Sequence, residues 1–261
     1  MSDAAPQGTP QGSPQGNPGD ILNWPMLKIV YRTDPDRVAA LLPPGLSPTS
    51  EPLVTLTVYN FPVQNEPELG LVMNVAASYD GIDGEYCLGY AIDQEQAVYI
   101  SREHWGQPKY LAEIRYFRMM DQVEARVTHK GYSFVEFKGA VSGTDEPGEI
   151  IETNEWWIKC ARAVTMQPNE YDYPPNVVRV YAKYRTAFRQ TLQGELVLRE
   201  SPWDPLAQAL PMREQVDAYL WWPEFLDRQI TLAGPLDEEG FWPFADTIGG
   251  TRFPGAHGGP A

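Results

Sequence analysis

The sequence predicts a mainly β fold of the α+β class, in which a large antiparallel sheet closes into a barrel-like form with a few short helices. About ten or more segments have the alternation or the β-branched content of strands, and only two short helical segments stand among them. The 261 residues include 25 prolines and 22 glycines, a supply of turn residues that suits a strand-rich fold. Because the strands follow one another without alternating helices, we do not expect a parallel βαβ fold, and a closed sheet can enclose a ligand cavity.

The chain reads as a single domain between two loosely structured ends. Three copies of Pro-Gln-Gly stand within residues 1–19, which carry almost no apolar side chains. Such a segment cannot bury enough surface to offset the entropy lost on ordering, so we predict a disordered tail. We expect one domain over residues 20–249 and a frayed C-terminus over residues 250–261, where glycine and proline return.

The strands of the first half are marked by β-branched and alternating residues. We predict them at residues 27–31, 53–61, 71–79 and 85–91. The segment 62–70, which contains Glu66 and Glu68, reads as a polar loop between two of these strands.

Two helices are predicted in the same half of the chain. The first takes Thr33 or Asp34 as its N-cap, has a proline in its first turn and runs through Leu42. The second follows Asp93, which opens a D-x-x-Q spacing typical of a capping box, and it ends at Gly106 before a proline.

The second half of the domain consists almost entirely of predicted strands. A Lys-Gly turn joins two of them into a hairpin, and residues 202–211 form a proline-rich connection with one helical turn. The strands are predicted at residues 109–117, 123–129, 132–141, 155–164, 177–187, 192–199, 215–222 and 225–232.

Charge and composition exclude several classes of function. A formal net charge of −15 disfavours nucleic acids and anionic membranes as partners, because both attract a basic face. No apolar run approaches the roughly 20 residues that span a bilayer, and no secretory signal begins the chain, so we expect a cytoplasmic protein. Cys87 and Cys160 are expected to be buried, reduced thiols. No metal-ligand spacing, phosphate-binding glycine loop or nucleophile elbow is present.

Lys109 stands at an unusual junction. The predicted helix ends at Gly106, Pro108 forces a turn, and Lys109 opens the next strand-like segment. At such a place the backbone is held on both sides while the amine can face a dry pocket, where it can be neutral and nucleophilic. The alternative is an ordinary surface lysine.

Three separated stretches carry a family resemblance. They are VYRTD at 30–34 with LLPPGL at 41–46 and EPLV at 51–54, GIDGEY at 81–86 continuing to Asp93, and RE at 102–103 with GQPK at 106–109. PLA at 205–207 extends the similarity towards the end of the chain. In this order and spacing the stretches resemble the acetoacetate decarboxylase-like superfamily over about residues 25–235, which implies that family's fold.

The resemblance implies a lysine Schiff base at Lys109 with a small keto acid. The protonated imine would be the electron sink for a breaking carbon–carbon bond, so no cofactor is expected. The chemistry needs a neutral amine, and an unperturbed lysine is neutral in only about one molecule in several thousand at pH 7. Burial in an apolar pocket can lower the pKa by several units. Family members assemble from dimers, so the resemblance also implies a homo-oligomer.

The sequence departs from the decarboxylases around this lysine. Tyr110 follows Lys109, where those enzymes have a second lysine; in a strand the two residues point to opposite faces. The decarboxylases are expected to have an arginine and two glutamates in the pocket. At two of these three positions this sequence has Trp24 and Thr57. The third falls near Gly70, where Glu66 or Glu68 could stand only if the alignment slips. These departures resemble the pyruvate aldolase–dehydratases, in which an enamine attacks an aldehyde before water is lost.

Several other residues are candidates for binding or support. Gln107 could hydrogen-bond a substrate carboxylate or carbonyl, and Glu103 suits a structural partner for an arginine on its helix better than a catalytic role. We expect Arg32 and Arg102 to form buried ion pairs. The supporting candidates are Gln107, Glu103, Tyr86, Tyr79 and Trp24.

The sequence thus predicts a cofactor-free carbon–carbon lyase acting on small keto acids, of the β-keto acid decarboxylase type. The first alternative is a pyruvate aldolase–dehydratase that also takes an aldehyde. The second alternative is a non-catalytic barrel that binds a small ligand, with Lys109 as a salt-bridge lysine.

Overall fold

The computed structural model describes residues 24–63, 66–245 and 250–254. Its strands are β1 (Met26–Arg32), β2 (Leu46–Pro48), β3 (Leu53–Val63), β4 (Glu66–Tyr79), β5 (Ile82–Ile92), β6 (Lys109–Leu111), β7 (Glu113–Met119), β8 (Gln122–His129), β9 (Tyr132–Asp145), β10 (Ile150–Arg162), β11 (Tyr171–Leu198) and β12 (Glu214–Pro235). Its helices are α1 (Pro35–Leu41), α2 (Glu95–Trp105), α3 (Leu206–Ala209) and α4 (Glu238–Ala245). The predicted Pro-Gln-Gly tail lies outside the described residues.

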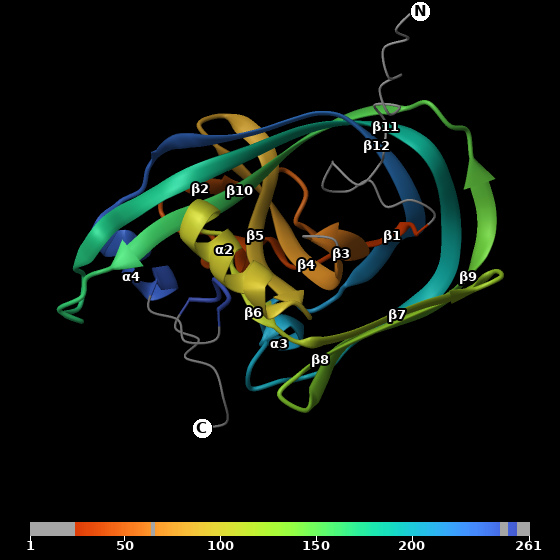
Figure 1. Cartoon of the computed structure of the whole chain (residues 1–261), viewed down its shortest axis with the longest axis horizontal. Helices are drawn as coiled ribbons and strands as arrows, with labels where there is room; N and C mark the ends of the chain where they lie inside the picture. The colour runs from red at the N-terminus through yellow and green to blue at the C-terminus, as the bar shows by residue number, and fades with distance from the viewer. Residues whose placement is uncertain (1–23, 64–65, 246–249, 255–261) are drawn as a thin grey trace, which may run out of the picture.

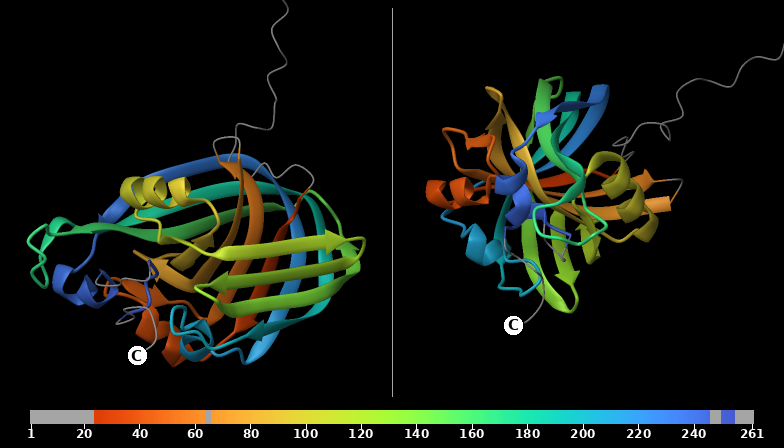
Figure 2. Two further views of the ribbon diagram at one scale, coloured as in Figure 1. Left: turned by 60° about the horizontal axis from the view of Figure 1, so that its bottom comes forward. Right: turned by 90° about the vertical axis from the view of Figure 1, so that its left-hand side faces the viewer.

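The strands form one twelve-stranded sheet within the described residues, and the sheet closes on itself (Figure 1). The ring runs β10, β5, β4, β3, β1, β12, β11, and β11 pairs again with β10. Strands β9, β8 and β7 extend from β11 as an antiparallel flap, whereas β6 adds to β5 in parallel. Figure 2 shows β11 and β12 curving together along the length of the molecule. The predicted mainly β architecture is confirmed, with two parallel pairings, β5–β10 and β5–β6, in an otherwise antiparallel sheet.

The two faces of the sheet carry two different hydrophobic clusters. The larger cluster takes alternate residues such as Ile29, Leu56 and Trp156. The smaller cluster takes the intervening residues, such as Tyr59 and Trp157. Because successive side chains in a strand point to opposite faces, a residue's parity decides which cluster it joins. The functional candidates described below lie on the face of the smaller cluster.

The predicted polar loop at residues 62–70 is wrong. Strands β3 and β4 pair from Val54↔Val75 to Val63↔Glu66, so most of that segment is a β-hairpin. Its alternation was hidden because the inward-facing positions are held by Glu68 and Gly70, neither of which looks like a core residue. A buried glutamate is compatible with a strand only when it has a partner, and the partner here is distant in sequence.

Four predicted strands of the second half merge into two. Residues 171–198 form the single strand β11 and residues 214–235 the single strand β12, which pair along most of their length. The apparent break in β12 is Pro223, which pairs with Thr186 beside a register shift. A bulge tolerates a residue without a backbone N–H, so the proline does not end the strand. Conversely, the predicted strand 109–117 divides into β6 and β7 at Ala112.

The helix ends also differ in part from the predictions. Asp93 does not cap α2; its Oδ1 accepts a hydrogen bond from Leu69 N at 2.8 Å, and the N-cap is Gln94. Asp34 caps α1 without a side-chain bond, because its carboxylate binds Arg213. The predicted C-cap is confirmed: Gly106 ends α2 in the left-handed region at φ 69°.

The end of the described chain is more ordered than the sequence predicts. Helix α4 forms despite Pro243, and Phe253 and Arg252 are buried. The expected fraying from residue 250 is therefore wrong for residues 251–253, which pack against the sheet through the bond from Arg252 N to Leu88 O at 2.7 Å. No helix among the described residues is long and apolar enough to cross a membrane.

Candidate active site

The backbone of Lys109 is fixed from several directions. Gly106 brings the end of α2 so close to β10 that a Cβ at this position would overlap Ile158 O and the Lys159 backbone. Lys109 then pairs with Tyr90 of β5, where Tyr90 N donates to Pro108 O at 2.9 Å. Arg102 NH1 donates to the carbonyl oxygen of Lys109 at 3.2 Å. The turn and the parallel pairing together aim the side chain at the face of the smaller cluster.

The amine of Lys109 is buried against one carboxylate. Lys109 is 5% exposed and Glu68 is fully buried. Nζ lies 3.0 Å from Glu68 Oε1 and 3.1 Å from Oε2, so the amine is shared between both oxygens. The Tyr59 hydroxyl donates to Glu68 Oε1 at 2.7 Å. The three side chains form a continuous hydrogen-bonded chain across β3, β4 and β6.

Gly70 makes this arrangement possible. It stands opposite Tyr59 in the β3–β4 pairing, and a Cβ at Gly70 would overlap the Tyr59 ring and hydroxyl. The ring therefore lies over the glycine, stacked on Phe61 at 4.6 Å between centroids, and its hydroxyl reaches Glu68 two residues along β4. The glycine is needed here for close approach rather than for a special backbone conformation.

Burial makes the amine of Lys109 a weaker base. Desolvation lowers the pKa of Lys109 from its ordinary value of 10.5, and the charge of Arg228 lowers it further. Glu68 opposes both effects through its charge and its hydrogen bond, yet the net direction remains downward. A lowered pKa increases the fraction of neutral, nucleophilic amine at neutral pH.

A second carboxylate belongs to the same face. The Tyr90 hydroxyl donates to Glu155 Oε1 at 3.1 Å, and Trp157 Nε1 donates to the same oxygen at 2.7 Å. Burial raises the pKa of Glu155 and the neighbouring Glu85 carboxylate adds to the rise, while the hydrogen bonds from Trp157 and Tyr90 oppose it. The Tyr90 ring centroid lies 5.9 Å from Lys109 Nζ, which places this aromatic ring between the two carboxylate groups.

A cavity of about 800 Å³ adjoins the strand that carries the lysine. Its wall includes Lys109, Leu111, Tyr99 and His129. Glu68 and Tyr59 are not among its lining residues, so this cavity borders the Lys109 segment rather than the Glu68 carboxylate.

The structure does not gather the predicted supporting residues around the amine. Tyr86 is buried in the larger cluster on the opposite face, and Tyr79 packs against that same cluster. Trp24 lies edge-on to Tyr116 at 5.9 Å between centroids. Gln107 and Glu103 line a different pocket, described below.

The two arginines and the lysine's neighbour have structural contacts. Arg102 donates to the carbonyl oxygens of Lys109 and Gly250, so the expected buried ion pair is wrong for it. Arg32 does pair with Glu51 and Glu214, but at a half-exposed position. Tyr110 points away from Lys109 as predicted, and its hydroxyl donates to Asp204 at 2.6 Å.

Cys87 is buried and Cys160 is half-buried, and both are free thiols.

Sequence reasoning missed Tyr59, Tyr90 and Glu155, and it placed Glu68 in a loop. The signal for Glu68 was the spacing of Glu68, Gly70 and Val72, which continues the strand face of β4. The third decarboxylase pocket position falls near Gly70 in the sequence, and Glu68 can take it only if the alignment shifts. The structure is compatible with such a shift, because Glu68 rather than Gly70 contacts Lys109.

Comparisons with known proteins show similarity to one protein family. A family model described as acetoacetate decarboxylase matches residues 4–234. The acetoacetate decarboxylase of Paraburkholderia phytofirmans is 38% identical over 95 residues, which are 35% of this chain and 36% of that protein. The match thus spans about a third of that relative's length.

Two solved structures have a similar fold at low sequence identity. The acetoacetate decarboxylase of Legionella pneumophila has a TM-score of 0.67 at 18% identity, covering 81% of this chain and 84% of that one. The enduracididine biosynthesis enzyme MppR, complexed with the condensation product of pyruvate and imidazole 4-carboxaldehyde, has a TM-score of 0.61 at 16% identity. That match covers 79% of this chain and 86% of the other.

Proposed function

The chain belongs to the acetoacetate decarboxylase family, and from this premise we propose that it is a cofactor-free carbon–carbon lyase that forms an imine between Lys109 and a small keto acid. The observation that carries the proposal is the pairing of a buried amine with a single buried carboxylate at 3.0 Å. The amine has a lowered pKa, and the carboxylate is placed to take and return its proton.

Imine formation uses Lys109 and Glu68 together. Glu68 accepts the proton of the ammonium group, and the freed lone pair of Nζ attacks the keto carbon. The resulting carbinolamine loses its hydroxyl as water, with the proton supplied by Glu68, and the nitrogen lone pair forms the C=N bond. Tyr59 stabilises the carboxylate whenever Glu68 is ionised, since its hydroxyl donates to Oε1.

With a β-keto acid, the imine allows decarboxylation. The bond between the α-carbon and the carboxylate breaks, its electron pair moves into the protonated C=N group, and carbon dioxide leaves the protonated imine as the enamine forms. Protonation of the enamine carbon gives a new imine, and water then releases the ketone and restores the amine. Family membership and the decarboxylase relatives support this reaction type.

A pyruvate aldolase–dehydratase is the second candidate. Here the imine of pyruvate loses a methyl proton, the enamine carbon attacks an aldehyde, and water is eliminated from the product. The likeness to MppR, which was solved with a pyruvate–aldehyde condensation product, supports this candidate. Trp24 and Thr57 at the places of the decarboxylase arginine and glutamate support it as well. A barrel that only binds a small ligand is the remaining alternative.

Product analysis tests the proposal and separates the two reactions. The protein would be incubated with acetoacetate alone, and with pyruvate plus imidazole 4-carboxaldehyde, and the products followed by proton NMR. Acetone formation above the spontaneous rate supports the decarboxylase, and a dehydrated condensation product supports the aldolase–dehydratase. Either activity must disappear in Lys109→Met. Folded protein that turns over neither substrate set would favour the binding barrel and contradict the proposal for these substrates.

A further inference from the structure

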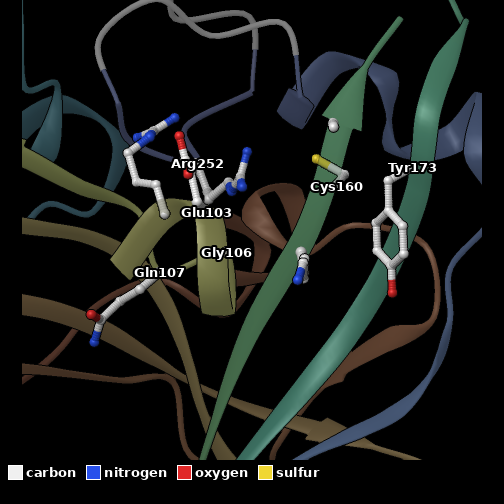
Figure 3. A pocket seen from close by; sticks show the side chains of 9 residues that line it. Glu103, Gly106, Gln107, Cys160, Tyr173 and Arg252 are labelled. Atoms are coloured by element: carbon white, nitrogen blue, oxygen red, sulfur yellow. The ribbon is translucent and has the colours of Figure 1, made fainter. Parts of the chain in front are cut away.

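A second pocket lies at the C-terminal end of α2, and Lys109 is not among the residues that line it. It has a volume of about 310 Å³, and its wall comes from the end of α2, strands β10 and β11, and the buried C-terminal segment (Figure 3). Figure 3 shows Cys160 and Tyr173 on the two neighbouring strands, with Glu103 and Arg252 beyond Cys160. Neither Glu68 nor Tyr59 lines this pocket. Arg102 lines this pocket and also bonds the carbonyl oxygen of Lys109, so the pocket adjoins the proposed active site without including the Lys109–Glu68 pair.

Three cations converge on this pocket, which we call the arginine pocket and define by Arg102, Arg252, Lys159, Glu103 and Cys160. Among the described residues that line it, Glu103 is the only carboxylate, and it is exposed at the surface of α2. Among the described residues, no ion pair joins a carboxylate to Arg102, Arg252 or Lys159. The pocket thus has an excess of positive charge in a protein of net charge −15.

Among the described residues, the hydrogen-bond acceptors of the two guanidinium groups are carbonyl oxygens, and the Arg252 guanidinium also lies 5.7 Å from the Phe241 ring centroid. Arg252 is 7% exposed, and it donates to Phe244 O at 3.3 Å and Ile158 O at 3.0 Å. Its Nε is buried without a hydrogen-bond partner. Arg102 donates to Gly250 O at 3.0 Å as well as to Lys109 O. Carbonyl oxygens fix the positions of these groups, and no carboxylate in the described part of the chain forms an ion pair with either of them.

Two buried like charges are costly unless something neutralises them. Burial lowers the pKa of Arg102 to about 10, and the repulsion of Arg252 adds to the effect. An unpaired buried charge is unfavourable, and a bound anion removes much of that cost. Arginines whose guanidinium groups are already fixed by carbonyl oxygens lose little further entropy on binding, and forked N–H groups suit carboxylate and phosphate oxygens.

We propose that the arginine pocket binds a small multivalent anion that bears phosphate or clustered carboxylate groups, held by Arg102, Arg252 and Lys159. Lys159 is the adjustable member, since the one hydrogen bond of its Nζ within the described part of the chain goes to His104 O at 3.1 Å and can be exchanged for a ligand. Glu103 opposes binding by its negative charge. The proposal does not depend on the chemistry assigned to Lys109.

Cys160 supplies a direct reporter of occupancy. It is half-buried in the wall of the pocket, whereas Cys87, the other cysteine of the chain, is fully buried. N-ethylmaleimide is uncharged, so its reaction with Cys160 responds to steric protection rather than to competition between anions. Intact-mass analysis then counts a single adduct, and Cys160→Ser removes it.

The test measures this labelling rate with inorganic phosphate in one arm and citrate in another, at constant ionic strength set by chloride. We expect at least one anion to slow labelling about fivefold or more at saturation. Lys159→Gln should raise the anion concentration that gives half-maximal protection by about threefold to tenfold, because binding becomes weaker. Glu103→Gln should lower that concentration by a similar factor. Lys138→Gln makes the same charge change at an exposed site outside the pocket and should leave it unchanged.

The two anions separate the possible sources of the ligand. Protection by phosphate alone assigns a phosphate-bearing ligand, and protection by citrate alone assigns a polycarboxylate. Labelling that neither anion slows beyond the chloride control would overturn the proposal. Equal half-protecting concentrations in Lys159→Gln, Glu103→Gln and Lys138→Gln would overturn the proposal too, because the anion would then bind elsewhere.

Discussion

The amine of Lys109 and the carboxylate of Glu68 lie 3.0 Å apart, with both side chains buried, although 41 positions separate them in the chain. The strand β4 brings the carboxylate to the same face of the sheet as the lysine of β6, with β5 between them. Glu68 is the acceptor for the ammonium proton of Lys109, and the Tyr59 hydroxyl donates a further hydrogen bond to Glu68. The predictions below test the pair, its support and the chain around it.

Removing the amine should destabilise the fold as well as stop the reaction. Lys109→Met leaves Glu68 buried without its cation, which costs about 3 kcal/mol for a pair of this kind. Adding Glu68→Gln to Lys109→Met removes the stranded charge, so the double variant should be at least as stable as Lys109→Met alone. Urea unfolding of the wild type and the three variants completes the cycle. Additive losses would mean that the two side chains do not interact energetically.

The pH dependence of Lys109 reactivity should move in a defined direction. Burial lowers the pKa of Lys109 and Glu68 raises it, so Glu68→Gln removes the raising contribution. The pKa in the variant should therefore fall further below 10.5, and the midpoint for amine modification should shift to lower pH. The rate of modification by an amine-selective reagent, mapped to Lys109 by mass spectrometry, gives both midpoints. An upward shift in Glu68→Gln would contradict the assigned role of Glu68.

Turnover in Glu68→Gln should fall even though its amine is more often neutral. The variant lacks the group that returns a proton to the carbinolamine, a contribution of about 10²–10⁴ for general acid–base catalysis. A Glu68→Gln enzyme with wild-type turnover would restrict Glu68 to a structural role.

Gly70 should be intolerant of a single added methyl group. In Gly70→Ala the Cβ meets the Tyr59 ring, so the ring must move and lose its bond to Glu68. We expect a loss of about 1–3 kcal/mol in the free energy of unfolding, together with reduced activity. Gly143→Ala is the matched control, because a Cβ there lies 3.9 Å from Thr191 Cβ in ordinary contact. Equal stability of the two variants would contradict the close approach of Tyr59.

The Pro-Gln-Gly segment should be dispensable. Deleting residues 1–19 removes few apolar side chains, so the melting temperature and turnover should match those of the full chain. A clear loss of either quantity in differential scanning calorimetry or a product assay would assign the segment a role in the folded protein.

The sequence predicts the ring of strands and the importance of Lys109, but not which side chains contact Lys109. Lys109 is recognisable because a helix stop, a proline and a strand start coincide around it, all of which are local properties. Glu68 depends on which strands are neighbours and on a glycine two positions away, neither of which local pattern decides. Likewise, Tyr90 of β5 lies next to Lys109 and Glu155 because β5 pairs in parallel with β6 and with β10.

Strand ends show the same limit of local patterns. Pro223 looks like a terminator, and it sits inside β12 because the opposing register shift near Thr186 accommodates it. Phe253 lies in a stretch dominated by glycine and proline, and it is buried because the larger cluster offers it a place. Packing overrides local composition in both cases.

The central claim is that the Lys109 amine forms an imine with a keto acid, and borohydride trapping tests it most directly. The protein would be incubated with acetoacetate or pyruvate, reduced with sodium borohydride, and its intact mass and peptide map compared with those of Lys109→Met. The account predicts one added substrate-derived group, located on the peptide that contains Lys109 and missing from the variant. An adduct on another lysine, or no adduct with either acid in folded protein, would contradict it.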